Sequence, residues 1–404
     1  MQKKILFIPT YTYLTSPIYE ELLSKLDDFE VTYLEKLYIN NDANDQLRCK
    51  GVSKKFKEKF FRYIELELDT KEDKFYSKIR NFFILYKFQK NLKNIIKNIK
   101  PDIIVTGSDI KLSVRSIKKY FPNLPIIILQ TAPTANGNCL LSLQEKIKYI
   151  IFNKIFGLCF FAKQKCIFKE YSDTYILLWG EYFKSGVGNN HDISKVKIVG
   201  NIKFDKFALI NTKSKESKKK FFKINNIKGF SSVVTICTNS IINLEVAIIQ
   251  SVMDLYIKII LENKNIFFVI KPHPREDINK IEQIFQSEKL ENMLVTTSEL
   301  YDVYKYTDVH ISSFSTTASE AMAAGIPIII VNPNNMIKAD FYSNDIGEHV
   351  TNFAQLNDIL SKTLSIEYQD NFFKKREIYG KKLFYKLDGK ASERVKDIIV
   401  DTLK

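Results

Sequence analysis

Short apolar runs recur along this chain of 404 residues, and each run ends in a polar loop before a helical stretch begins. Ile5-Leu-Phe-Ile8 and Pro125-Ile-Ile-Ile-Leu129 show the pattern early, and Ile266-Phe-Phe-Val-Ile270 and Pro327-Ile-Ile-Ile-Val331 repeat it later. Runs of this length are typical of strands buried on both faces of a parallel sheet. Strands and helices in alternation build a doubly wound sheet. We therefore predict an α/β fold of doubly wound, Rossmann-like sheets.

The alternation is interrupted by a hydrophilic stretch at residues 211–220, which has the composition of a linker. A chain of this length suits two α/β domains better than one. We predict an N-terminal domain over residues 1–205, a C-terminal domain over 206–369, and a final helix over 370–404 that returns toward the first domain. The two Rossmann-like domains are expected to face a central cleft.

Charge is distributed unevenly around a net value of +15. Residues 50–100 hold 15 Lys and Arg against 6 Asp and Glu, whereas residues 301–350 hold 2 against 6. This asymmetry favours an anionic acceptor or a membrane surface, and it argues against a nucleic-acid partner. Residues 52–100 are predicted to be helical. We expect a helix that covers the sheet and exposes its basic face to solvent. Contact of residues 50–100 with the inner membrane surface is the alternative.

The five cysteines are an odd number without metal-ligand spacing, which favours a reducing cytoplasm. The N-terminal apolar run is too short for a signal peptide, and no stretch of about 18 uncharged apolar residues exists. The sequence predicts a cytoplasmic protein, with peripheral attachment to the inner membrane as the alternative.

Two prolines stiffen the loop after the predicted strand at residues 266–270, in the sequence Lys271-Pro-His-Pro-Arg275. They hold the imidazole of His273 close to the carboxyl end of the strand, between two basic side chains. An imidazole flanked by two basic side chains suits a phosphate ligand. The position fits as well, because ligands of doubly wound sheets bind at the carboxyl ends of strands. A histidine that only packs or caps there is the alternative. We predict that Lys271, His273, Pro274 and Arg275 bind the phosphate of a nucleotide-activated substrate, the donor, and that His273 is catalytic.

Six hydroxyl residues fall within residues 312–319, directly before a strong helix-forming run that starts at Glu320. Helix N-termini favour anions and hydroxyls add hydrogen-bond donors, so phosphate oxygens are suitable ligands. A helix cap alone would need only one or two hydroxyls. Glu320 is a candidate partner for a ribose diol, and a first-turn acid that complements the helix dipole is its other interpretation. The donor-binding candidates here are Ser312, Ser313, Ser315, Thr316, Thr317 and Glu320.

A third strand-to-helix turn follows the predicted strand at residues 233–237. It supplies Thr238, Asn239 and Ser240 as donor-binding candidates, although helix capping explains them about as well. No Gly-x-Gly-x-x-Gly or Walker A loop follows a predicted strand, which argues against dinucleotide and ATP chemistry. No Asp-x-Asp pair ends a predicted strand, and no His/Cys/carboxylate cluster has metal-ligand spacing. We predict a metal-independent site without a cofactor.

Five segments resemble the GT-B glycosyltransferases of bacterial surface-polysaccharide assembly. They are Leu178-Trp-Gly-Glu181, Val199-Gly-Asn-Ile-Lys-Phe-Asp205, Lys271-Pro-His-Pro274, residues 312–327, and Leu387-Asp-Gly-Lys-Ala-Ser-Glu-Arg394. The His-Pro pair and the Ser-rich loop are similar to the CMP-binding signature of sialyl- and polysialyltransferases, and residues 200–205 resemble Kdo transferases. The resemblance implies a GT-B fold. It also implies that the donor phosphate contacts His273, Ser312, Ser313 and Ser315, with Glu320 near the ribose.

Together with the missing metal spacing, the resemblance implies an inverting glycosyltransferase that moves a sugar from a nucleotide donor to a cell-surface glycan or a lipid-linked acceptor. A CMP-linked nonulosonic acid such as sialic acid or Kdo is the favoured donor, and a UDP-sugar is the alternative. Our candidate for the base is Asp109, because it follows a predicted first-domain strand; an Asx turn is its other interpretation.

Three other functions fit parts of the pattern. CDP-glycerol-type polyol-phosphate transferases share the His-Pro and Ser-rich loops. UDP-N-acetylglucosamine 2-epimerases share the architecture, but they carry Ser-Gly-Gly where this chain has Ser-Phe-Ser at residues 313–315. A non-catalytic, membrane-associated binding protein that retains the fold is the third hypothesis.

Overall fold

A computed structural model describes residues 2–8, 21–37, 61–65, 75–108, 112–131, 140–159, 162, 168–210, 215–238, 246–273, 276–286, 290–313, 315–335 and 347–404. The chain forms two compact units. The first comprises Met1–Lys203, Leu383–Tyr385 and Lys390–Lys404, and the second comprises Phe204–Lys382 and Lys386–Gly389. Within the described ranges, no helix is long and apolar enough to span a bilayer.

The first unit is built on a seven-stranded sheet in the order β3-β2-β1-β4-β5-β6-β7, in which all neighbouring strands are parallel. Its central strands are mostly apolar and almost wholly buried, as the apolar runs predicted. The strands are β1 (Lys4–Ile8), β2 (Glu30–Leu37), β3 (Phe61–Glu65), β4 (Ile103–Thr106), β5 (Ile126–Leu129), β6 (Tyr175–Leu178) and β7 (Val196–Ile198).

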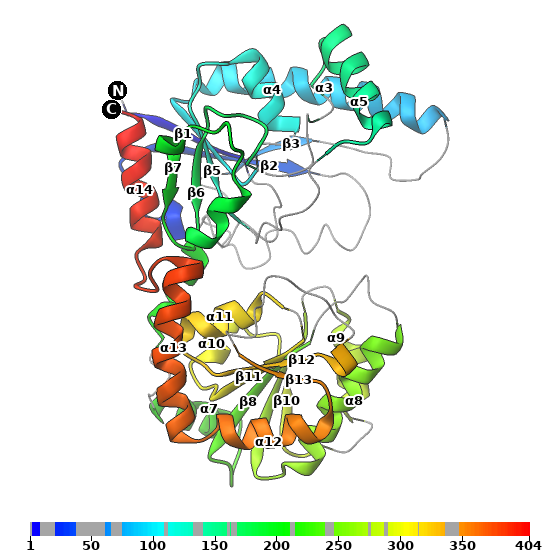
Figure 1. The fold of residues 1–404 in the computed structure, drawn as a ribbon, viewed down its shortest axis with the longest axis vertical. Helices are drawn as coiled ribbons and strands as arrows, with labels where there is room; N and C mark the ends of the chain where they lie inside the picture. The colour runs from blue at the N-terminus through cyan, green and yellow to red at the C-terminus, as the bar shows by residue number, and fades with distance from the viewer. Residues whose placement is uncertain are drawn as a thin grey trace. The chain divides into compact units, whose positions relative to one another are not determined.

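Helices cover this sheet, and Figure 1 shows α14, in red, running along it although it comes from the end of the chain. The buried residues Ala391, Val395 and Ile399 of α14 pack in one cluster with Ile5 and Phe7 of β1. The helical segments of the unit are α3 (Phe75–Ile99), α4 (Leu112–Tyr120), α5 (Leu143–Tyr149), the π-helix η1 (Ile150–Ile155), the 3-10 helices η2 (Glu181–Gly186) and η3 (Ile193–Lys195), and α14 (Ala391–Thr402).

The expectation that residues 52–100 are helical is wrong at one point, because strand β3 lies within them. Its sequence, Phe-Arg-Tyr-Ile-Glu, contains two charged residues in five, and β3 pairs in parallel with Tyr33–Leu37 of β2 at the edge of the sheet. An edge strand tolerates charged side chains, so its Lys-rich surroundings concealed it. The helical part of the segment, within the described residues, is α3, whose Phe88 and Leu92 are buried.

The second unit has a six-stranded sheet in the order β10-β9-β8-β11-β12-β13, again with all pairs parallel. Its strands are β8 (Ser232–Cys237), β9 (Ile266–Lys271), β10 (Met293–Val295), β11 (Val309–Ser312), β12 (Ile328–Val331) and β13 (Glu348–Val350). Its helical segments are η4 (Ile202–Phe204), which begins in the first unit, α6 (Asp205–Ala208), α7 (Lys215–Ile224), α8 (Val246–Glu262), α9 (Ile278–Gln286), α10 (Leu300–Tyr304), α11 (Thr317–Ala324), η5 (Pro333–Asn335), α12 (Phe353–Thr363) and α13 (Ile366–Phe384).

Two predicted segments differ from the structure. The hydrophilic stretch at 211–220 is helical from Lys215 onward, because α7 packs its Phe221 into an apolar cluster beneath the sheet. The single helix expected over 370–404 is instead α13 followed by α14. Tyr385 and Gly389 between them have φ values of 62° and 72°, in the left-handed region that ends a helix.

Two of the segments that carry the family resemblance pack against each other within the first unit. Gly200 has a φ of 89°, and a Cβ there would lie 3.1 Å from the Arg394 guanidinium and 3.2 Å from Ala391 Cβ. The Arg394 Nε–H donates to the Val199 carbonyl at 2.7 Å. Because Gly200 permits this close approach, residues 199–201 and 387–394 serve to hold α14 beside β7.

Candidate functional site

The three predicted donor-binding loops follow three adjacent strands of the second sheet. β8 lies between β9 and β11, and the last residue of β8, Cys237, pairs with Lys271 of β9 and with Ser312 of β11. All three strands are parallel and end at the same level. The loops that follow them therefore start side by side at the carboxyl edge of the sheet, where doubly wound folds bind ligands.

The environment of Cys237 shows that these loops converge. Burial raises the pKa of the Cys237 thiol to about 12, with Glu320 and Glu276 adding to the rise and Lys271 opposing it. These three charged groups therefore lie around one thiol of β8, although they come from two other segments, the end of β9 with its loop and α11. The thiol itself stays protonated at neutral pH, so we assign it no chemical role.

The loop that carries His273 is held by a carboxylate to which sequence reasoning assigned no role. The main-chain N–H of His273 donates to Glu276 Oε2 at 2.7 Å and to Thr238 Oγ1 at 3.3 Å. The Thr238 hydroxyl donates to the same carboxylate oxygen. Glu276 thus fixes both His273 and Thr238. The signal available in the sequence was an acid three residues after the histidine, the spacing at which a side chain reaches back to a main-chain N–H.

The side chain of His273 is half-buried, and burial, followed by the positive charge of Lys271, lowers its pKa. At neutral pH it is therefore a neutral imidazole that donates through one ring nitrogen. The structure places Lys271, His273 and Thr238 next to one another. Pro274, Arg275, Asn239 and Ser240 lie outside the described residues.

Part of the hydroxyl run is committed to a buried network around His310, a residue to which the sequence analysis gave no role. His310 Nε2 lies 3.0 Å from Ser312 Oγ and 3.4 Å from Thr317 Oγ1. Its Nδ1 lies 3.1 Å from the Tyr304 hydroxyl, which also donates to the Thr317 carbonyl at 3.0 Å. Burial lowers the pKa of His310 to about 3. We interpret Ser312 as a positioning residue, since its hydroxyl is engaged inside the unit.

The remaining hydroxyls surround the start of α11. Ser313 is 1% exposed, and its Oγ has no hydrogen-bond partner among the described residues. Ser315 Oγ accepts from the Thr317 N–H at 3.3 Å, and the N–H groups of Ala318 and Ser319 bond to carbonyls within the same turn. The main-chain N–H groups in the first turn of α11 are thus largely hydrogen-bonded within the turn, so the site presents hydroxyls more than free N–H groups. A buried hydroxyl without a partner is unusual, and a bound ligand is one explanation for it.

The other two predicted side chains are on α11 or at its cap. Thr316, the N-cap residue, is exposed and makes no side-chain cap hydrogen bond. Glu320 is 3% exposed and lies near Cys237. Its predicted contact with a ribose stays a prediction.

In the first unit, the predicted base Asp109 lies outside the described residues. The residue before it, Ser108, is fully buried at the end of β4, and its hydroxyl has no hydrogen-bond partner in the described part of the chain. The next two strands of the sheet, β5 and β6, end in a hydrogen-bonded pair of residues. The Trp179 N–H donates to Gln130 Oε1 at 2.9 Å, and the Trp179 indole donates to the Gln130 carbonyl at 2.7 Å. The region of Ser108 therefore stays the candidate for the first unit's share of the chemistry.

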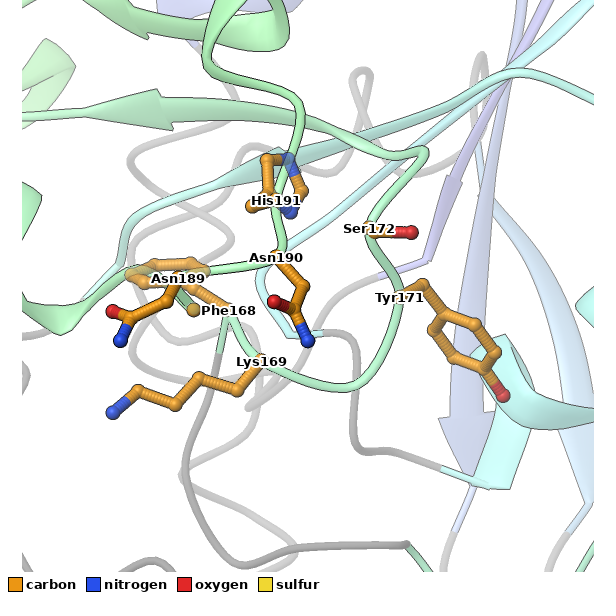
Figure 2. Close-up of a pocket in the computed structure, with 8 residues that line it drawn as sticks. Phe168, Lys169, Tyr171, Ser172, Asn189, Asn190 and His191 are labelled. Carbon is orange, nitrogen blue, oxygen red and sulfur yellow. The ribbon is translucent and has the colours of Figure 1, made fainter.

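A hollow of about 340 Å³ lies at a different place in the first unit, and Figure 2 shows the residues that line it. It lies between residues 168–172 and 188–191, which are tied together by the Gly188 N–H that donates to the Phe168 carbonyl at 3.2 Å. Both segments precede the strands β6 and β7, so the hollow is at the amino edge of the sheet. Ligands of doubly wound sheets bind at the opposite edge, and we assign this hollow no part in donor binding.

The two sheets and their connections define the GT-B fold, with two Rossmann-like domains. No protein-family model matches the sequence, and no curated protein matches it. Among the residues that the structure describes, no group of three or more His, Cys, Asp and Glu side chains is arranged to hold a metal ion.

Solved structures of the same fold align over the whole chain. A UDP-GlcNAc 2-epimerase from Neisseria meningitidis bound to UDP-GlcNAc is 17% identical, with 100% of this chain and 99% of that chain covered and a TM-score of 0.57. A glycosyltransferase from Rickettsia africae is 15% identical, with 100% and 99% covered and a TM-score of 0.56. The wall teichoic acid polymerase TagF is 13% identical, with 99% and 88% covered and a TM-score of 0.52. At these identities the likeness establishes the fold.

Proposed function

We propose that the protein is a GT-B glycosyltransferase that moves a sugar from a nucleotide donor to an anionic cell-surface glycan or a lipid-linked acceptor. The observation that carries the proposal is the convergence of the β8, β9 and β11 loops around Cys237. Lys271 and His273 stand at the end of β9, and the buried Ser313 hydroxyl, directly after β11, has no hydrogen-bond partner in the described part of the site. Such a combination of hydroxyls, one imidazole and one ammonium group suits the phosphates of a nucleotide.

Transfer of a sugar requires stabilisation of the departing phosphate and a base for the acceptor hydroxyl. We assign the phosphate to Lys271, which supplies charge, to neutral His273, which donates a hydrogen bond, and to the hydroxyls of Ser313, Ser315 and Thr316. These groups would act without a metal ion or a cofactor. Asp109 stays our candidate for the base.

The favoured donor is a CMP-linked nonulosonic acid, with a UDP-sugar as the alternative, and this choice rests on the similarity of residues 271–274 and 312–315 to CMP-sugar transferases. Two other activities have specific support. UDP-GlcNAc 2-epimerases have the same fold over the full chain, although Phe314 stands where their glycine would be. A polyol-phosphate transferase is favoured by the likeness to TagF, whose structure was solved with CDPG.

Replacement of the proposed phosphate donor tests the function. We expect His273→Ala to lower transfer roughly a hundredfold or more, because one donor to the developing charge is lost, while the thermal midpoint changes little. His349→Ala, on strand β13, is the matched control and should retain activity. Full activity of His273→Ala would refute the assignment.

Donor identity is tested by a thermal-shift panel of CMP, CDP, UDP, UMP and GDP, in which a nucleotide at 100 times its dissociation constant adds about 2.7 kcal/mol. CDP-glycerol labelled in the glycerol phosphate then separates the activities, since phosphorus in the product indicates polyol-phosphate transfer. Conversion of UDP-GlcNAc without any acceptor indicates an epimerase. Failure of every nucleotide to raise the midpoint would favour a non-catalytic binding protein.

A further inference from the structure

The segment from Leu140 to Phe156 exposes more apolar side chains than it buries, and it belongs to neither the candidate site nor the core. Helix α5 and the π-helix η1 contain no buried residue, and all their residues are described. The exposed fractions reach 75% for Leu143, 69% for Ile155 and 65% for Phe156. We call this set the 140–156 apolar surface, and it consists of Leu140, Leu143, Ile147, Ile150, Ile151, Ile155 and Phe156.

Local sequence explains why the surface is one continuous face. Ser142 and Glu145 form a capping box that starts α5, with the Glu145 N–H donating to Ser142 Oγ at 3.3 Å and the Ser142 N–H donating to Glu145 Oε2 at 2.7 Å. Leu143, Ile147 and Ile151 then follow at intervals of four residues, and Ile155 follows after four more. The wider turn of the π-helix keeps the later residues on the face of the earlier ones.

The element is fixed to the first unit at its end. The Arg115 Nε–H of α4 donates to the Cys159 carbonyl at 2.7 Å. A Cβ on Gly157 would lie 3.6 Å from Lys119 Nζ, so the segment after η1 lies against the end of α4. The exposed side chains are therefore presented by a helix that is anchored, and not by a detached tail.

Basic residues accompany the apolar face. Lys146, Lys148 and Lys154 lie in α5 and η1, and the only acid there, Glu145, is engaged in the capping box. Residues 83–99 of α3, together with Lys100 directly after it, add five Lys and no Asp or Glu. α3 adjoins this region through Lys93, whose Nζ lies 4.5 Å from the centroid of the Tyr120 ring, next to Lys119.

We propose that α5 and η1 form a membrane-docking element that lies flat in the headgroup region of an anionic bilayer. An apolar face of large aliphatic residues with lysines beside it is the composition of interfacial helices. A second copy of the chain fits worse, because pairing two of these surfaces would bring the lysines of both copies together. The lipid surface supplies both the apolar layer for the isoleucines and the phosphates for the lysines.

The proposed membrane contact differs from the one that the charge distribution suggested at residues 50–100. Residues 140–156 make the apolar contact, and the basic segment 50–100 contributes only through α3. The inference is independent of the proposed function. Vesicle binding requires neither donor nor acceptor, so either proposal can fail while the other stands.

Co-sedimentation of the full-length protein with vesicles tests the proposal. We expect binding to vesicles that contain roughly a third phosphatidylglycerol and much weaker binding to pure phosphatidylcholine, because each lysine near the surface adds about fivefold. Ile147→Asp with Ile151→Asp should lower the partition coefficient at least about tenfold. The matched control is Ile224→Asp with Ile366→Asp, two exposed isoleucines of the second unit that should leave binding unchanged.

A second variant measures insertion directly and preserves the test if the aspartates impair folding. Ile151→Trp should show a blue-shifted emission with anionic vesicles and quenching by brominated lipid, whereas Trp179, which is 6% exposed, should not respond. Three results would overturn the proposal: the wild type stays in the supernatant with both vesicles, the aspartate pair sediments like the wild type, or the wild type is a dimer in sedimentation velocity that the aspartate pair dissociates.

Discussion

The carboxyl edges of the two sheets are built differently, although both units are parallel sheets with helices. In the second unit, Glu276 bonds to both Thr238 after β8 and His273 after β9, and after β11 the buried Ser313 hydroxyl is left without a partner among the described residues. In the first unit, β5 and β6 end in a closed pair, with both N–H groups of Trp179 satisfied by Gln130. The protein itself completes the edge at β5 and β6, whereas a ligand can complete the edge after β11. Ser108, after β4 of the first unit, has a similar buried hydroxyl without a partner among the described residues. The predictions below test this contrast.

Acid should destabilise the second unit selectively. The pKa of His310 is about 3 in the folded chain, against about 6.5 when unfolded, so the unfolded chain binds the proton more tightly. The stability that neutral His310 contributes is present above about pH 6.5 and is lost as the pH falls toward 3. At pH 4.5 the loss should be roughly 3 kcal/mol.

The single tryptophan, Trp179, reports on the first unit alone, and far-UV circular dichroism reports on both units. Urea unfolding at pH 7.5 and 4.5 should therefore shift the dichroism transition more than the fluorescence transition. His310→Gln should remove most of the difference. If both transitions shift equally in the wild type, the contrast between the units does not depend on His310.

Glu276 should matter for activity more than for stability. Glu276→Ala removes the acceptor for the His273 N–H and for the Thr238 hydroxyl, so the loop loses its fixed geometry. We expect kcat/KM to fall about a hundredfold, or ~2.7 kcal/mol in transition-state binding. Asp277→Ala, at the exposed neighbouring acid, is the matched control. Glu276→Gln should recover part of the activity, since an amide oxygen still accepts; a purely structural role would instead lower the thermal midpoint in proportion to activity.

Local patterns in the sequence were sufficient for the architecture and for the loops. Unbroken apolar runs predicted the buried parallel strands, and the His-Pro and Ser-rich segments each follow a strand as expected. The polar networks could not be predicted, because Glu276 and His310 acquire their partners only when loops and helices distant in sequence meet. Strand β3 was missed because an edge strand needs little apolar sequence. The 140–156 apolar surface was missed because its periodicity is that of an ordinary buried helix, and only the structure shows that nothing described covers it.

The first unit should be sensitive to close packing where the second is sensitive to polar contacts. Gly200→Ala places a Cβ within 3.3 Å of three heavy atoms while φ is 89°, and we expect the free energy of unfolding to fall by about 2 kcal/mol. Gly229 is the matched control, because its φ is 87° and a Cβ there would meet nothing within 4 Å. Gly229→Ala should therefore show only the backbone strain, about 1 kcal/mol. Equal losses in the two variants would mean that the contact with α14 contributes nothing.

The smallest expected effect separates a ligand site from a packing defect. Ser313→Ala removes a buried hydroxyl that has no partner in the described structure, so the free protein should become about 1 kcal/mol more stable. If that hydroxyl binds a nucleotide phosphate, the same variant should bind its nucleotide five- to tenfold more weakly, which is about 1 kcal/mol in the opposite direction. Ser319→Ala, at another buried hydroxyl of this kind within α11, should gain the stability without losing affinity. Isothermal titration calorimetry and denaturant unfolding measure both quantities. A gain in stability with unchanged affinity at Ser313 would show that its hydroxyl is only a defect in packing, and the distinction between the two sheet edges would then rest on Lys271, His273 and Glu276.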